Sequence, residues 1–188
     1  IDAGVSLVGE WGSGELLDCA IGGAKWDAGK KVGGVGLVAK SGGKAELRDC
    51  WAAGNSRAGI RSCNTASVAI LNARTCDNGQ FGVLVLDANE VTLKAVEAES
   101  NGEYGIHIRG NTEPSIDGCN CTKNGNAGIA FVDHSSGKAA SNVCREKRDN
   151  GNTAADTAAP SLEGNQCGGN AKHRIRVSAG SRGESKRA

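Results

Sequence analysis

The sequence predicts an all-β solenoid of about seven coils with a repeat of about 23 residues, and three observations support this fold class. Seven eight-residue rows can be aligned; the last six begin at steps of 23 residues, whereas the first precedes the second by 31. Apolar and polar residues alternate at fixed columns of these rows, as in β-strands. The composition, with 29 Gly, 2 Pro and 3% aromatic residues, suits thin coils packed on small side chains. The rows begin at Gly14, Ala45, Val68, Val91, Pro114, Gly137 and Pro160.

Each row predicts a strand segment whose third, sixth and eighth columns point into the solenoid. The second column, which includes Glu15, Glu46 and Lys138, faces water because successive side chains of a strand point to opposite faces. The sixth and eighth columns hold small or apolar residues in most rows, as an interior stack requires. The third column is apolar in all seven rows and consists of Leu16, Leu47, Ile70, Leu93, Ile116, Ala139 and Leu162.

A second predicted strand follows each row, after a turn. Asn-Gly dipeptides such as Asn78-Gly79 tolerate positive φ and are typical of sharp corners. A Gly followed by Ile or Val comes next and begins the strand. The turns are placed at Asn55-Ser56, Asn78-Gly79, Asn101-Gly102, Asn124-Gly125 and Asn150-Gly151. The Gly-Ile and Gly-Val pairs are Gly59-Ile60, Gly82-Val83, Gly105-Ile106 and Gly128-Ile129.

These motifs together resemble a right-handed parallel β-helix of the pectin-lyase-like kind. The segment Asn124 to Ile129, followed later by Pro160 to Asn165, is similar to repeats in the β-helix region of certain F-box proteins. The resemblance runs from about Gly4 to Val177 and implies a right-handed helix, in line with the general right-handedness of parallel crossovers. Lyases, epimerases, hydrolases, adhesins and non-catalytic modules share this fold, so the resemblance implies no single activity.

The repeat predicts one β-helix domain over residues 1–177 and a flexible basic tail over 178–188. Residues 22–31 account for the longer first step and are interpreted as a protruding loop of about eight extra residues, or as a partial cap on the helix end. Residues 145–149 are interpreted as a charged widening of one turn. The chain contains no Met, which suggests a processed chain or a fragment of a longer one.

Charge and hydropathy argue against a nucleic-acid partner and against a membrane-spanning helix. Basic and acidic residues number 22 and 21, and the net charge of +1 argues against a nucleic-acid partner, because such proteins usually carry a basic excess or stripe. No apolar run approaches the ~18 residues that a membrane-spanning helix needs.

The eight cysteines allow three interpretations. Cys19 and Cys50 share the sixth column with Cys119, so they are expected to pack inside as small hydrophobes. Disulfides between neighbouring coils are sterically conceivable, because adjacent strands lie about 4.8 Å apart. Zinc is the third interpretation, with Cys119, Cys121, Cys144 and Cys167 as ligands.

Cys63 and Cys76 fall outside the inward columns and are expected to be exposed. Many reduced thiols favour an intracellular or organellar compartment over a secreted one.

A search for catalytic residues in the outward fourth column of the rows finds no acidic cluster, and the one acid beside a base there, Asp117 next to Lys94, is interpreted as a surface salt bridge. We therefore predict no catalytic residue, no metal and no cofactor. The candidate binding residues are Trp26, Trp51 and Tyr104, which offer stacking surfaces for sugars, and Arg61, Leu84 and His107, which share one outward ladder and resemble a mixed contact surface.

The sequence therefore favours a non-catalytic β-helix scaffold or protein-interaction module, as a subunit or fragment of a larger assembly. A protein partner is expected, and one place for it is the open end of the solenoid, where bare strand edges invite pairing. The alternative is a carbohydrate-binding or polysaccharide-cleaving, lyase-like β-helix protein.

Overall fold

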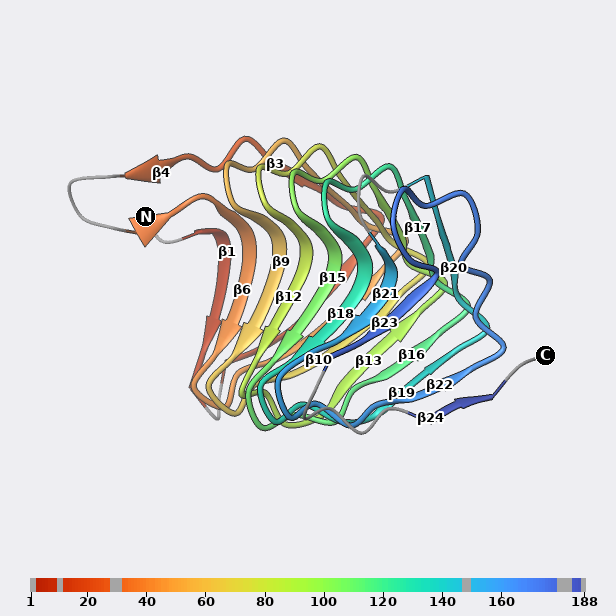
Figure 1. The fold of residues 1–188 in the computed structure, drawn as a ribbon. Coiled ribbons are helices and arrows are strands. Elements are labelled where there is room, and N and C mark those ends of the chain that lie inside the picture. The colour runs from red at the N-terminus through yellow and green to blue at the C-terminus, as the bar shows by residue number, and fades with distance from the viewer. Residues whose placement is uncertain (1–2, 10–11, 28–31, 147–149, 179–183, 187–188) are drawn as a thin grey trace.

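The computed structural model describes residues 3–9, 12–27, 32–146, 150–178 and 184–186. Within these ranges the chain forms 24 strands and no helix, and most strands stack into three parallel sheets that wind around one axis (Figure 1). The predicted parallel β-helix with a repeat of 23 residues is confirmed. In the same ranges there is no helix of the length and hydropathy that a membrane crossing would need.

The sheets, named A, B and C here, each take one strand from a coil. In spatial order, sheet A contains β1 (Ala3–Val8), β6 (Val35–Lys40), β9 (Ala58–Cys63), β12 (Phe81–Leu86), β15 (Tyr104–Arg109), β18 (Ala127–Val132), β21 (Asn150–Ala154) and β23 (Ile175–Val177). Sheet B contains β2 (Ser13–Leu17), β7 (Lys44–Arg48), β10 (Ser67–Leu71), β13 (Val91–Lys94), β16 (Ser115–Asp117), β19 (Lys138–Ala140), β22 (Ser161–Glu163) and β24 (Glu184–Lys186). Sheet C contains β3 (Ala20–Gly22), β8 (Trp51–Ala53), β11 (Arg74–Cys76), β14 (Glu97–Glu99), β17 (Asn120–Thr122) and β20 (Val143–Arg145).

The core is a set of side-chain columns that run along the axis. In sheet B, Ile70 pairs in register with Leu47 and with Leu93, so the predicted third column is one continuous stack. All three of these side chains are fully buried. Burying a Leu or Ile side chain contributes about 1.5–3 kcal/mol, so these columns supply most of the stability of the coil stack.

The corners between sheets C and A differ from the prediction. Asn78, Asn101 and their following glycines have negative φ; the positive φ belongs to the residue before each Asn, such as Asp77 at 53° and Ser100 at 56°. The Asn side chains are buried. Asn78 Nδ2 donates to Asn101 Oδ1 at 3.0 Å, and Asn101 Nδ2 donates to Asn124 Oδ1 at 2.9 Å. We call Asn55, Asn78, Asn101 and Asn124 the asparagine ladder.

The glycine that follows Asn78, Asn101 and Asn124 is required by the close approach of neighbouring coils. Gly102 has an ordinary negative φ, but a Cβ built on it would collide with the carbonyl oxygen of Gly79 in the preceding coil. The backbone N–H of Gly102 also donates to Asn78 O at 2.9 Å. The Asn-Gly signal therefore marks a buried amide and a tight contact, in place of two residues with positive φ.

The predicted widening at residues 145–149 is wrong. Cys121 pairs with Cys144 before this turn, and Ala127 pairs with Asn150 after it, so the step is 23 residues on both sides. Asn150-Gly151 begins strand β21 and does not form the corner. Asn152 consequently occupies the interior position that Ile129 holds one coil earlier. Residues 147–149 themselves lie outside the described residues.

The predicted insertion in the first coil projects as a short antiparallel ribbon. Sixteen residue positions separate Ile21 from Leu37, against eight between their pairing partners Ala52 and Ile60, which agrees with the prediction of about eight extra residues. Strands β4 (Trp26–Asp27) and β5 (Val32–Gly33) pair within it, beside the N-terminal coil (Figure 1). The predicted tail falls largely outside the described residues, apart from β24, which pairs with β22.

Candidate functional site

The outer face of sheet A carries a second apolar cluster, separate from the core. Register places Phe81 between Ala58 and Tyr104, and Leu84 between Arg61 and His107. These two outward columns run side by side along the sheet. Val35, Val38 and Ala58 are buried on this outer face, and Phe81 and Leu84 are partly buried against them.

Three rings from two neighbouring strands pack together at the centre of this surface. Phe81 and Tyr104 stack with centroids 6.0 Å apart and planes inclined by 15°. The His107 ring lies 4.5 Å from the Tyr104 ring and 5.1 Å from the Phe81 ring. We call Phe81, Tyr104 and His107 the ring cluster; pairs of this geometry add about 0.5–1.5 kcal/mol each beyond the area they bury.

The polar atoms in this surface are not satisfied internally. Both ring nitrogens of His107 are buried and have no hydrogen-bond partner, and the same holds for Arg61 Nε. The pKa of His107 is lowered to about 4, mainly by burial and to a smaller extent by the charge of nearby Arg109, while Asp133 opposes both effects. The imidazole is therefore neutral at pH 7, and the surface gathers aromatic and apolar groups around an uncharged histidine.

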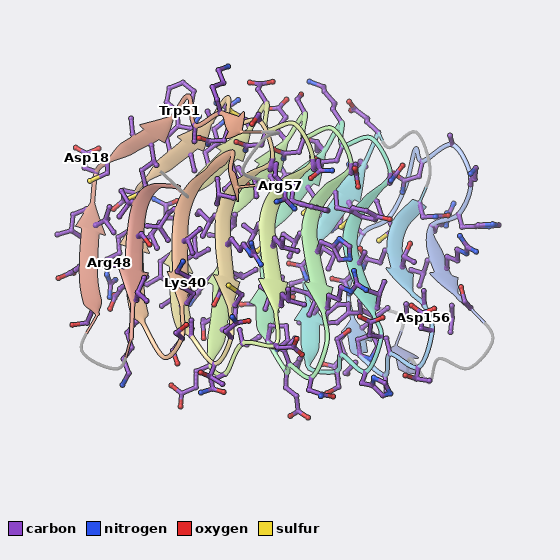
Figure 2. The ribbon with its side chains drawn as sticks, turned by 90° about the vertical axis from the view of Figure 1, so that its left-hand side faces the viewer. Asp18, Lys40, Arg48, Trp51, Arg57 and Asp156 are labelled. Atoms are coloured by element: carbon purple, nitrogen blue, oxygen red, sulfur yellow. The ribbon has the colours of Figure 1, made fainter. Side chains whose placement is uncertain are left out.

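Polar side chains border this surface on both sides. On one side Arg57 Nε donates to Gln80 Oε1 at 3.4 Å, and Gln80 Nε2 donates to Glu103 Oε1 at 3.2 Å, a ladder that begins at the Arg57 labelled in Figure 2. On the other side Arg109 pairs with Asp133 at 2.7 Å. The arrangement is an apolar centre with a polar rim.

Trp51 forms a second candidate surface, on sheet C (Figure 2). Its side chain is 51% exposed, yet its indole N–H donates to Cys76 Sγ at 3.0 Å, which holds the ring against the sheet. The guanidinium of Arg74 lies 5.9 Å from the ring centroid and pairs with Glu99 at 2.8 Å. A hollow of about 370 Å³ beside the ring is lined by Asp49, Asn72, Arg74 and Glu97, among others.

A shallow hollow of about 650 Å³ on the outer face of sheet B is lined by Glu15, Glu46, Glu90 and Lys44, among others. Glu46 pairs with Arg48, and Lys44 and the other two Glu side chains are exposed. Exposed charges of this kind are well solvated, so we assign no function to this hollow.

The cysteines confirm the interior interpretation for the stacked columns. Cys119, Cys121, Cys144 and Cys167 are buried, and no disulfide joins any of the eight cysteines. Burial raises the pKa of Cys119 to about 12, and contact with the thiols of Cys121 and Cys167, together with burial, raises the pKa of Cys144. In the described part of the chain no three His, Cys, Asp or Glu side chains are placed to hold a metal, so the zinc interpretation gains no support.

The prediction that Cys63 and Cys76 are exposed is wrong, because both are buried. Both point outward, but neighbouring side chains cover them. Cys76 accepts the indole hydrogen bond of Trp51, and Cys63 is flanked by Lys40 and Leu86 in the adjacent strands.

The structure brings some predicted site residues together and separates others. Arg61, Leu84, Tyr104 and His107 share the surface on sheet A, whereas Trp51 lies on sheet C. Trp26 lies on β4 of the ribbon, and its side chain is outside the described part of the structure. Phe81 was missed, although its position 23 residues before Tyr104 places it in the same column.

Most of the chain matches a known protein family. A family model described as a right-handed beta helix region matches residues 33–185, which is most of the chain. No curated protein and no solved structure matches the sequence.

Proposed function

The chain belongs to the right-handed beta helix family, and we propose that it is a non-catalytic protein-interaction module, a subunit or fragment of a larger assembly. The surface on sheet A that contains the ring cluster, Leu84 and Arg61 would bind the partner. Its apolar, aromatic centre and polar rim are the observation that carries the proposal, because specific protein interfaces share this anatomy.

The residue types in this surface also support a protein partner. Tyr and Arg are enriched among the residues that dominate binding energy, and they cluster near the centre of an interface. Tyr104 and Arg61 lie on adjoining columns of a sheet whose backbone is held by ladder hydrogen bonds on both sides. A surface fixed in this way loses little conformational entropy on binding, which favours affinity.

The test begins with isolation of the partner from an extract of the source cells, followed by reconstitution of the purified pair. We expect the double variant Phe81→Ala/Tyr104→Ala to raise the Kd about 30-fold or more, which corresponds to about 2 kcal/mol or more. Thr92→Ala, on the exposed face of sheet B, is the matched control and should leave the Kd unchanged. The absence of any stoichiometric protein partner, or a Kd that the double variant leaves unchanged, would overturn the proposal.

The exposed indole of Trp51 supports a second candidate, carbohydrate binding. Its N–H already donates a hydrogen bond to Cys76, so the indole can contact a ligand only through its flat apolar ring. The polar groups of Asp49, Asn72 and Glu97 line the hollow beside this ring. A pocket that binds a polar ligand typically combines an aromatic wall with a few placed hydrogen-bonding groups.

Affinity electrophoresis with neutral and acidic polysaccharides, with and without Ca²⁺, separates the two candidates. Retention that Trp51→Ala abolishes and Phe81→Ala preserves would favour carbohydrate binding at sheet C. The protein is also incubated with each polysaccharide in solution. Unsaturated sugar products in these incubations would indicate a lyase and contradict the non-catalytic proposal. Under our proposal, no polysaccharide retards the protein.

A further inference from the structure

We propose that Cys19 and Cys50 form a redox-active thiol pair, which a small-molecule disulfide such as oxidised glutathione converts to an intrachain disulfide between the first and second coils. This chemistry requires no partner and is independent of the proposed function. It rests on the register of the two strands, on the direction of the thiols and on a difference in access among the eight cysteines.

Register places the two cysteines side by side. Leu17 pairs with Arg48 before them, and Ala20 pairs with Trp51 after them, so Cys19 and Cys50 lie at equivalent positions of two neighbouring corners, between strands that are paired in register. Adjacent strands are about 4.8 Å apart, which is inside the range of about 4.4–6.8 Å that disulfide-bonded Cα atoms span. The backbone N–H of Trp51 donates to Cys19 O at 2.7 Å and holds this alignment.

The Cys50 thiol points toward the first coil. Its Sγ lies 3.1 Å from Leu16 O, a carbonyl of the strand that leads to Cys19, and 3.2 Å from Arg48 O in its own coil. The Cys19 Sγ donates to Leu17 O at 3.0 Å, two residues before it. Both sulfurs therefore lie at the same corner, next to the Asp18 labelled in Figure 2. Burial is the main cause of a raised pKa at Cys50, and the neighbouring Cys19 thiol also raises it.

Access to solvent distinguishes this pair from the other stacked thiols. Cys19 is the one cysteine of the eight that is not buried. Cys121 and Cys144 also face each other on adjacent strands, but both are fully buried. A reagent in solution can therefore reach the first pair and not the second, because thiol exchange requires access of the attacking sulfur to the disulfide.

The reaction proceeds in two exchanges. The Cys19 thiolate attacks one sulfur of oxidised glutathione, forms a mixed disulfide and releases one glutathione thiolate, which takes up a proton. The Cys50 thiolate then attacks the Cys19 sulfur and releases the second glutathione. The two protein thiols lose two electrons and two protons, and one glutathione disulfide is reduced to two thiols.

The cross-link would restrain an end of the solenoid whose interior is only partly covered. Val5, Leu7 and Leu16 point inward in the first coil but are only partly buried. The disulfide would enclose residues 20–49, with the β4–β5 ribbon between its ends. A closed loop of this kind limits local opening of the coils that it joins.

The test treats the folded, reduced protein with oxidised glutathione, alkylates the remaining thiols and maps the peptides by mass spectrometry. The wild type should lose two hydrogen atoms and two alkylatable thiols, with one cross-link between Cys19 and Cys50. Cys50→Ala should stop at a glutathione adduct on Cys19, and Cys19→Ser should form neither product. Cys121→Ser is the matched control and should behave as the wild type.

Three results would overturn the proposal: no reaction in the wild type, a lasting glutathione adduct on Cys19 in the wild type, or a cross-link between other cysteines. Circular dichroism before and after oxidation confirms that each variant is folded. In the oxidised protein, amide exchange in β1, β2 and β3 should be slower than in the reduced protein. Dithiothreitol should restore the faster exchange.

Discussion

His107 lies at an outward position of strand β15, yet both of its ring nitrogens are shielded from water. The shielding comes from neighbours in the same two columns, because Phe81 and Tyr104 pack against the imidazole. A residue that alternation alone places in water is thus held in an apolar setting. Burial is the first cause of the fall in its pKa to about 4.

This pKa predicts that acid destabilises the protein through His107. Above pH 6.5 the ring is neutral in both states, so its full contribution to stability is present. Between pH 6.5 and about 4 the unfolded chain binds a proton that the folded chain does not, so stability falls with pH. Urea unfolding at pH 7 and pH 4.5 should show a loss of about 2–3 kcal/mol from this group.

The variant His107→Leu should lack this part of the pH dependence, whereas His134→Gln, at an exposed position, should keep it. Carboxylates that titrate in the same pH range contribute equally to both proteins. The difference in pH dependence of the unfolding free energy between wild type and His107→Leu therefore reports the contribution of His107 alone. Equal slopes for these two proteins would contradict the shielding of His107 seen in the structure.

At the scale of the element, the four corners between sheets C and A at Asn55, Asn78, Asn101 and Asn124 depend on the asparagine ladder. Asn101 Oδ1 accepts hydrogen bonds from the backbone N–H and from Nδ2 of Asn78, at 3.2 and 3.0 Å. Asn101 Nδ2 donates to Thr75 O and to Asn124 Oδ1, at 3.1 and 2.9 Å. The Asn101 side chain therefore connects its own coil to the coil before it and the coil after it. It does so at a corner, between strands β14 and β15.

We expect Asn101→Ala to lower the free energy of unfolding by about 2–3 kcal/mol, because it leaves buried polar groups of Asn78 and Thr75 unpaired. Asn120→Ala, at an exposed position of β17, should change it by about 0.5 kcal/mol or less. Urea denaturation of both variants measures the difference. A value for Asn101→Ala as small as that of the control would mean that the ladder adds nothing to stability.

At the scale of the whole molecule, each coil packs mainly on the coils before and after it. Central interior residues such as Leu93 and Ile106 are fully buried, whereas Val5 and Leu7 in the first coil and Ile175 in the last are only partly buried. The free energy of unfolding of such a stack is close to a sum of contributions from each coil and from each interface between neighbouring coils. An end coil has one such interface instead of two, so it is less stable than a central coil.

Amide exchange should therefore follow position along the axis. We expect strands β1, β2 and β23 to exchange faster than β13 and β15, because opening an end coil exposes fewer buried contacts. Mass spectrometry of deuterium uptake by the folded chain measures this gradient. Uniform exchange across all coils would instead show that the solenoid opens only as a single cooperative unit.

The coil period, the strand chemistry and the interior columns follow from the order of the residues alone. Leu47, Ile70 and Leu93 recur at 23 residues, and recurrence together with alternation is visible in one dimension. Three of the six candidate binding residues, Arg61, Leu84 and His107, fall on one ladder for the same reason, since a shared column in the alignment becomes a shared ladder in the sheet. Tyr104 lies on the neighbouring ladder, beside Phe81.

The positions of ambiguous residues become clear only in the folded chain, where neighbouring coils contact them. Asn124-Gly125 and Asn150-Gly151 are the same dipeptide, yet the first lies at a corner and the second begins a strand, because register with Ala127 determines the position of Asn150. Cys76 is an outward residue that Trp51 of the preceding coil covers. Burial of this kind depends on side chains from neighbouring coils. The alternation of residues along one coil therefore cannot predict it.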